Sequence, residues 1–140
     1  MPSEREVVAF VAAFASHWQG RDGFQRIMHP GATLWVAGAR APYAYEEAER
    51  FVTSVKQAIP DLSLRVLEWA ARGDAVFTEW EMSGTLAGRS ATWRGINRNT
   101  LDGARSRGAV SCWDRHALLE QVRPDCEPLD LGAELARLRS

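Results

Sequence analysis

The first sixty residues carry apolar side chains at helical spacing. Residues 3–19 place four of them three or four positions apart, at Val7, Val11, Phe14 and Trp18, and Ser3 followed by acidic residues is typical of a helix N-terminus. A short helical stretch over residues 24–28, a turn at His29-Pro30-Gly31 and a short strand over residues 32–38 are expected next. A second long helix is predicted over about 45–59, where Pro60 ends it.

From Asp61 onward apolar and polar residues alternate, which is the period of a strand with two different faces. Runs over residues 62–71, 75–86, 90–101 and 107–113 are separated by short segments that contain glycine, so they predict an antiparallel meander of long strands. Residues 114–122 predict a closing helical turn, and the tail holds a short helix with Leu131, Leu135 and Leu138. Helices followed by a meander are the order of an α+β fold.

Length and charge narrow the class of protein. The 140 residues, 46% of them hydrophobic, fit a single domain over 1–140 that can bury a core without metals or disulfides. A formal net charge of −1 removes the broad electrostatic argument for nucleic acid or membrane as the partner. Cys112 and Cys126 match neither a disulfide framework nor a metal site, and residues 1–10 have no signal layout, so we expect a cytoplasmic protein.

The alternation also sorts the meander into two faces. If Glu79 and Glu81 meet Arg94 and Arg98 on neighbouring strands, opposite charges share one solvated face. The other face then points inward. In the last strand, residues 107–113, the same alternation decides which side chains point inward. That inner face presents Trp80, Met82, Trp93, Asn97, Asn99, Ala109, Ser111 and Trp113. Three tryptophans with two amides and a hydroxyl predict an apolar pocket with a few polar groups, which is typical of a small-molecule site.

Other interpretations of the same residues stay open. Inward tryptophans under helices are often plain core, and buried amides such as Asn97 and Asn99 can bond backbone or water instead of a ligand. If the parity is inverted, Glu79 and Glu81 face inward as two carboxylates for acid–base work. The expected pocket also includes Trp35 of the first strand, and His17, which is either a satisfied histidine at the helix–sheet boundary or an acid or base in the pocket.

The order of the elements resembles the nuclear transport factor 2-like superfamily and, within it, the SnoaL-like polyketide cyclase branch, over about residues 4–122. The markers are His29-Pro30, the helix end at residues 58–62, the Gly73-Asp74 turn, residues 77–85, Asp102-Gly103, Trp113-Asp114 and residues 118–121. The resemblance implies a cone-shaped, curved antiparallel sheet wrapped by N-terminal helices around one deep pocket. It also implies a homodimer, and it leaves residues 123–140 as a C-terminal extension.

The resemblance further implies acid–base chemistry on an apolar polyketide- or steroid-like metabolite, without metal or organic cofactor. Relatives include cyclases, isomerases, limonene-type epoxide hydrolases and members with no known catalysis. Where cyclase and epoxide hydrolase relatives commonly carry the catalytic aspartate, this chain has Ser111, which cannot act as a general acid near neutral pH. Asp114 matches a second aspartate of that pattern and either caps the closing helix or, after a one-residue slip of the strand, becomes the acid.

These inferences combine into one hypothesis and two rivals. In the first, a cofactor-free isomerase, cyclase or hydratase moves a proton with Asp114 or Glu79, and Asn97, Asn99 and Ser111 hold a substrate oxygen between walls of Trp80, Trp93 and Trp113. In the second, the same fold binds a ligand or forms a dimer without catalysis. In the third, the charged outer face of the sheet binds a partner protein.

Overall fold

The computed structural model describes residues 1–139 and begins with the predicted N-terminal helix, α1 (Glu4–Trp18). The Ser3 hydroxyl accepts the N–H of Glu6 at 3.3 Å, and the Glu6 carboxylate accepts the N–H of Ser3 at 2.7 Å. This reciprocal capping box satisfies two of the backbone donors that a helix N-terminus leaves free. The bonds from Ser3 also lower the pKa of the Glu6 carboxyl.

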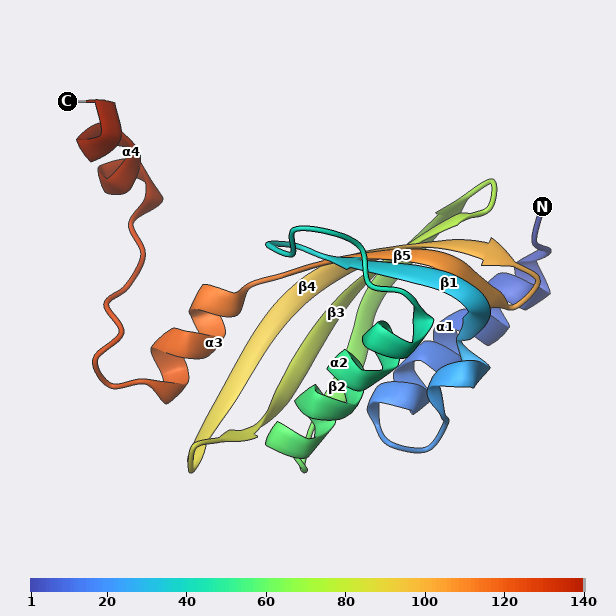
Figure 1. Ribbon diagram of the computed structural model, residues 1–140, viewed down its shortest axis with the longest axis horizontal. Helices are drawn as coiled ribbons and strands as arrows, with labels where there is room; N and C mark the ends of the chain where they lie inside the picture. The colour runs from blue at the N-terminus through green and yellow to red at the C-terminus, as the bar shows by residue number, and fades with distance from the viewer. Residues whose placement is uncertain (140) are drawn as a thin grey trace.

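Five strands and four further helical segments complete the fold (Figure 1). In chain order they are η1 (Phe24–Arg26), β1 (Met28–Val36), α2 (Tyr45–Ala58), β2 (Ser63–Arg72), β3 (Ala75–Leu86), β4 (Arg89–Asp102), β5 (Arg105–Trp113), α3 (Arg115–Val122) and α4 (Leu131–Arg139). The α+β class and the four-strand meander are therefore confirmed.

The strands form one curved sheet in the order β1-β5-β4-β3-β2. Strands β2 to β5 pair antiparallel as predicted, but β1 pairs with β5 in parallel, so the sheet is mixed. Parallel neighbours need a long crossover connection, which α2 and the first three meander strands supply here. Figure 1 shows α1 and α2 together on the concave side of the sheet.

The first strand begins earlier than expected. The predicted turn at residues 29–31 lies inside β1, where the pairing with β5 shifts register between Met28 and Thr33. Such an irregular stretch at the edge of the sheet tolerates Pro30, because proline has no N–H to give to a ladder. Leu34 then bonds Tyr43 on the other side of β1 through an isolated bridge.

The predicted parity of the meander is confirmed. Trp80, Met82, Trp93, Asn97 and Asn99 are all less than a tenth exposed on the concave side, where they face the helices. The inverted assignment, with Glu79 and Glu81 inward, is therefore wrong. Buried and more exposed side chains alternate through most of β3 and β4, as the prediction assumed.

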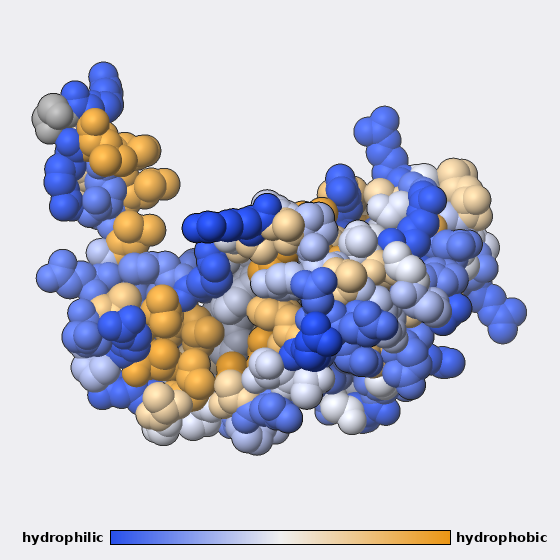
Figure 2. All heavy atoms as spheres, viewed as in Figure 1, coloured by the Kyte–Doolittle hydropathy of each residue, from blue (hydrophilic) through white to orange (hydrophobic). Residues whose placement is uncertain are grey.

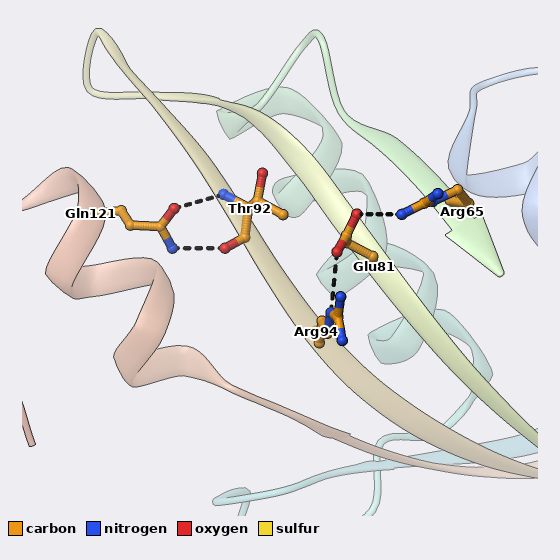
Figure 3. Close-up of polar contacts among 5 residues, drawn as sticks. All are labelled: Arg65, Glu81, Thr92, Arg94 and Gln121. Atoms are coloured by element: carbon orange, nitrogen blue, oxygen red, sulfur yellow. Dashed lines mark hydrogen bonds and ion pairs between the residues drawn. The ribbon is translucent and has the colours of Figure 1, made fainter. Parts of the chain in front are cut away.

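On the convex side the charges pair only in part as expected (Figure 3). Glu81 accepts hydrogen bonds from Arg65 at 3.0 Å and from Arg94 at 3.1 Å, and these contacts lower the pKa of the Glu81 carboxyl. The second expected pair does not form, since Arg98 lies opposite Phe77, and Glu79 lies opposite Ile96.

Helix α3 is docked on a stretch of β4 that extends beyond the end of β5. The Gln121 side chain donates to the carbonyl of Thr92 at 2.7 Å and accepts the N–H of Thr92 at 2.8 Å, as a neighbouring strand would (Figure 3). Helix α4 has no buried residue and extends away from the sheet (Figure 1). Within residues 1–139, none of the helices has the length and apolar character needed to cross a membrane.

Candidate functional site

An apolar cavity of about 200 Å³ lies between the concave face of the sheet and the helices α1, α2 and α3. Figure 2 shows hydrophobic surface over α3 and in the hollow between α3 and α2. We call this cavity the tryptophan pocket. Its walls are Phe14, Trp18, Phe51, Val55, Ala58, Ile59, Trp80, Met82, Leu86, Trp93, Asn97, Ser111, Trp113 and Leu118. Six of the residues expected on the inner face, Trp80, Met82, Trp93, Asn97, Ser111 and Trp113, thus meet at one place.

The polar floor of the pocket centres on Asn97. The indole N–H of Trp80 donates to the amide oxygen of Asn97 at 2.9 Å, and both side chains are buried. Gly95 lies opposite Trp80 in the β3–β4 ladder, and a Cβ at this glycine would overlap the six-membered part of the indole. The absent side chain therefore gives the Trp80 ring its space beside Asn97.

Two hydrogen-bonding groups of the pocket remain available to a ligand. The amide NH₂ of Asn97 and the hydroxyl of Ser111 form no hydrogen bond with any residue that the structure describes. Asn97 and Ser111 lie directly opposite each other on β4 and β5, so their side chains share one face at the short cross-strand spacing. The pair can hold one oxygen atom of a ligand from two sides.

All side chains that line the tryptophan pocket are uncharged and carry no acid or base that titrates near neutral pH. The expectation that Asp114 or Glu79 faces the pocket is wrong. The exposed Asp114 carboxylate caps α3 by accepting the N–H of Ala117 at 2.9 Å, and its own N–H bonds the carbonyl of Arg94. Glu79 lies on the convex face. The strand therefore has no slip that would turn Asp114 inward.

Asn99 lies farther along the concave face, beyond the walls of the pocket. It is 2% exposed, and its amide nitrogen and the Thr78 hydroxyl are both buried without a partner in the part of the chain that the structure describes. The tryptophan pocket does not reach either group. Asn99 is thus a buried polar residue of the core here, which corrects its expected place among the pocket residues.

His17 and Trp35 also lie outside the tryptophan pocket. The His17 ring is 2% exposed, packs against Trp18 and Phe24, and its Nδ1 lies 2.9 Å from the carbonyl oxygen of Asp22. Burial, with a smaller contribution from nearby Lys56, lowers the pKa of His17 to about 4. Trp35 is 36% exposed on the convex face, because Leu34 and Val36 take the inward positions of β1.

Sequence reasoning missed the half of the pocket that the helices supply. The missed residues are Phe14 and Trp18 of α1, Phe51, Val55 and Ala58 of α2, Ile59, Leu86 and Leu118. Most of them belong to the apolar stripes that predicted the helices, so the sequence already indicated that these side chains face inward. Whether such a stripe packs tightly or leaves a cavity depends on the crossing of helices and sheet, which periodicity does not encode.

A second depression, of about 560 Å³, lies at the surface between α2 and residues 23–25, and His17 is one of the residues that line it. Most of its walls are polar or charged, including Glu49, Arg50 and Lys56. We place the candidate ligand site in the tryptophan pocket, because small-molecule sites are mainly apolar with a few polar groups. Within residues 1–139 no three histidine, cysteine, aspartate or glutamate side chains gather to hold a metal ion.

Comparisons with known proteins agree with this architecture. No curated protein matches the chain at a significant level. Among solved structures, AclR of Streptomyces galilaeus, a candidate hydroxylase, is 15% identical with a TM-score of 0.77, covering 96% of this chain and 95% of its own. A candidate SnoaL-like polyketide cyclase of Jannaschia sp. CCS1 is 19% identical with a TM-score of 0.75, covering 89% and 95%.

A third neighbour, from Catenulispora acidiphila, has a ketosteroid isomerase-like fold, a TM-score of 0.72 and 16% identity over 85% of this chain and 97% of its own. At these identities the likeness concerns the fold alone. The family is shown by sequence, because the SnoaL-like domain family matches residues 7–107. This match spans most of α1, all of α2 and most of the meander, so the chain belongs to the SnoaL-like domain family.

Proposed function

We propose that this protein binds a flat, neutral, largely apolar ring compound in the tryptophan pocket and holds a carbonyl oxygen of that compound with Asn97 and Ser111. The observation that carries the proposal is the composition of the pocket, which joins aromatic walls to two free hydrogen-bonding groups. The volume of about 200 Å³ is below the ~300 Å³ at which drug-sized sites begin. The pocket therefore suits a small ring compound or one end of a larger polyketide- or steroid-like metabolite.

The chemistry that fits is stabilisation of negative charge on the ligand's carbonyl oxygen. Hydrogen bonds from Asn97 and Ser111 to that oxygen favour the enolate over the ketone and so make the neighbouring C–H more acidic. Isomerisation and cyclisation of polyketides both pass through such an enolate. The proton then goes to solvent or to another group of the ligand, because no carboxylate among residues 1–139 lines the pocket.

One other activity expected from the family fits this pocket less well. An epoxide hydrolase of the limonene type uses a carboxylate in the pocket, and the described part of the chain places none there. A binding protein without turnover is the second candidate function. The lack of an ionisable group in the pocket favours that candidate over an enzyme with general acid–base catalysis.

The test uses 1-tetralone, a two-ring aromatic ketone with an enolisable carbon. Binding is followed by tryptophan fluorescence, and enolisation by the rate at which deuterium from D₂O enters the carbon next to the carbonyl. We expect quenching and exchange faster than in buffer, without the bell-shaped pH profile of an acid–base pair. Ser111→Ala should weaken tetralone binding and leave binding of the hydrocarbon tetralin unchanged.

The outcomes separate the candidates. Tetralone binding without faster exchange supports the binding protein and rejects catalysis by the oxyanion contacts. A bell-shaped profile would contradict the absence of an acid–base group. If neither tetralone nor tetralin binds up to its solubility limit, the tryptophan pocket is not a site for such compounds.

We also propose that the convex face of the sheet pairs with a second copy of the chain. Three large apolar side chains, Trp35, Phe77 and Ile96, are 36–55% exposed there. Arg98 and Glu79 beside them form no ion pair with the residues that the structure describes. Because Arg98 lies opposite Phe77 and Glu79 lies opposite Ile96, these four side chains stand at the corners of a rectangle of about 5 by 7 Å on two strands.

A two-fold axis along the Phe77–Ile96 diagonal of this rectangle brings Arg98 of each subunit near Glu79 of the partner subunit. It also sets Phe77 and Ile96 each against its own copy. Sedimentation equilibrium tests the pairing. The wild type should be a dimer, Arg98→Glu should be a monomer, and the double variant Arg98→Glu/Glu79→Arg should recover the dimer. A monomeric wild type, or a double variant as monomeric as the single one, contradicts the proposal.

A further inference from the structure

The side-chain amide of Asn97 can present either of two opposite groups to a ligand. Its oxygen accepts hydrogen bonds and its NH₂ group donates them, and a half-turn of the amide exchanges the two. In this structure the amide faces two environments at once, the indole N–H of Trp80 and the tryptophan pocket. Whatever fixes the rotation of the amide therefore decides which ligand atoms the pocket accepts.

Trp80 fixes that rotation because an indole N–H can only donate. The donor is 2.9 Å from the Asn97 oxygen, and the two residues are 3% and 7% exposed. With the amide turned over, two N–H donors would meet at a place that water hardly reaches, which costs as much as a lost buried hydrogen bond. The NH₂ group of Asn97 is thus the part that remains for the pocket.

The position of the Trp80 ring is itself held by its neighbours. The indole lies over Gly95, where a Cβ would overlap ring atoms Cζ2 and Cη2. This contact and the bond to Asn97 restrain the N–H edge of the indole. The N–H of Trp80 is therefore not free to turn toward the pocket and offer itself to a ligand.

We propose that Trp80 is a positioning residue that makes the polar floor of the tryptophan pocket a hydrogen-bond donor, so that the pocket selects neutral ring compounds with an acceptor oxygen, such as ketones and quinones. This inference rests on the proposed function, because it concerns the same pocket. A ligand that offers an N–H at this place meets the NH₂ group of Asn97 and loses a hydrogen bond. The Ser111 hydroxyl can either donate or accept, so the selection comes from Asn97.

The test compares two bicyclic probes of similar size, 1-tetralone, which only accepts, and indole, which only donates through its N–H. Affinities are measured by calorimetry in a Ser111→Ala background, which removes the hydroxyl that can serve both probes. We expect tetralone to bind about tenfold more tightly than indole, since one buried polar group without a partner separates the two complexes. Tetralin, with no polar group, gives the affinity from apolar contact alone.

Trp80→Phe is the decisive variant, because it keeps an aromatic wall and removes the N–H that orients the amide. Asn97 can then turn its oxygen to the pocket, and the preference for tetralone over indole should fall toward one. Trp93→Phe is the matched control. It removes an indole from the same pocket but leaves the Trp80–Asn97 bond in place, so the preference should remain near its starting value while both affinities fall together.

The results distinguish this inference from the proposed function. If tetralone and tetralin bind but Trp80→Phe leaves the preference unchanged, Trp80 does not orient the amide, although the pocket still binds rings. Equal loss of preference in Trp80→Phe and Trp93→Phe also overturns the inference, because the preference would then depend on either tryptophan and not on the N–H of Trp80. If no probe binds the parent protein, the proposed function itself fails.

Discussion

Acidification should destabilise the protein through His17, because this histidine is a buried residue of the fold and does not line the tryptophan pocket. The carbonyl of Asp22 can only accept, so the Nδ1 atom of His17 carries the proton and Nε2 is a neutral nitrogen buried without a partner within residues 1–139. Protonation of Nε2 would place a cation in this buried site next to Lys56. Burial and the charge of Lys56 accordingly lower the pKa of His17 to about 4.

The sign and size of the effect follow from linkage. In the unfolded chain His17 has the ordinary histidine pKa of about 6.5, so between pH 6.5 and 4 the unfolded state binds a proton that the folded state does not. Stability is therefore lost as the pH falls through this window. The full loss is about 3 kcal/mol, of which about 2 kcal/mol is reached by pH 5.

The assay is urea unfolding from pH 7 to pH 4 for the wild type and for His17→Asn, whose amide can donate to Asp22 but does not titrate. The free energy of unfolding of the wild type should fall more steeply with acid, and the difference between the two proteins should change by about 3 kcal/mol. Lys56→Met should raise the pKa of His17 and so reduce the wild-type slope. Parallel curves for the wild type and His17→Asn would refute the reasoning, because His17 would then titrate alike in both states.

Three further substitutions test the architecture around the pocket. Gly95→Ala should push the Trp80 ring out of place, lower the free energy of unfolding in urea by about 1–3 kcal/mol and weaken tetralone binding. If neither value changes, the Trp80 ring can be accommodated beside a Cβ at position 95. Asp114→Ala should cost about 1 kcal/mol as a lost helix cap and leave tetralone binding intact, whereas lost deuterium exchange at the ketone would make Asp114 part of the chemistry. Gln121→Leu should speed amide hydrogen exchange at Thr92 at least tenfold, and unchanged exchange would show that α3 stays docked without this side chain.

The concave face could be predicted from the sequence because β3 and β4 are long and alternate through most of their length. Opposite charges at Glu81 and Arg94 identify one face as solvated, and this parity places Trp80 and Asn97 inward. The same approach fails for Trp35. Its strand is irregular between Met28 and Thr33, and apolar residues occupy both faces, so parity there does not distinguish inside from outside.

Other features depend on contacts between distant segments. The parallel pairing of β1 with β5 joins residues more than seventy positions apart, and no local pattern in either strand encodes its direction. Asp114 shows a different limit. Its position before α3 is compatible with both a cap and an acid, and only the bond from the Ala117 N–H decides between them. The helical half of the pocket escaped prediction because apolar stripes look alike whether they fill a core or border a cavity.

A crystal structure of the protein with 1-tetralone tests the central claim most directly. The account predicts the rings between the tryptophans of the pocket and the carbonyl oxygen within hydrogen-bond distance of both the Asn97 amide nitrogen and the Ser111 hydroxyl. A ketone seated instead in the polar depression beside Lys56, or one whose oxygen turns away from Asn97, would contradict it.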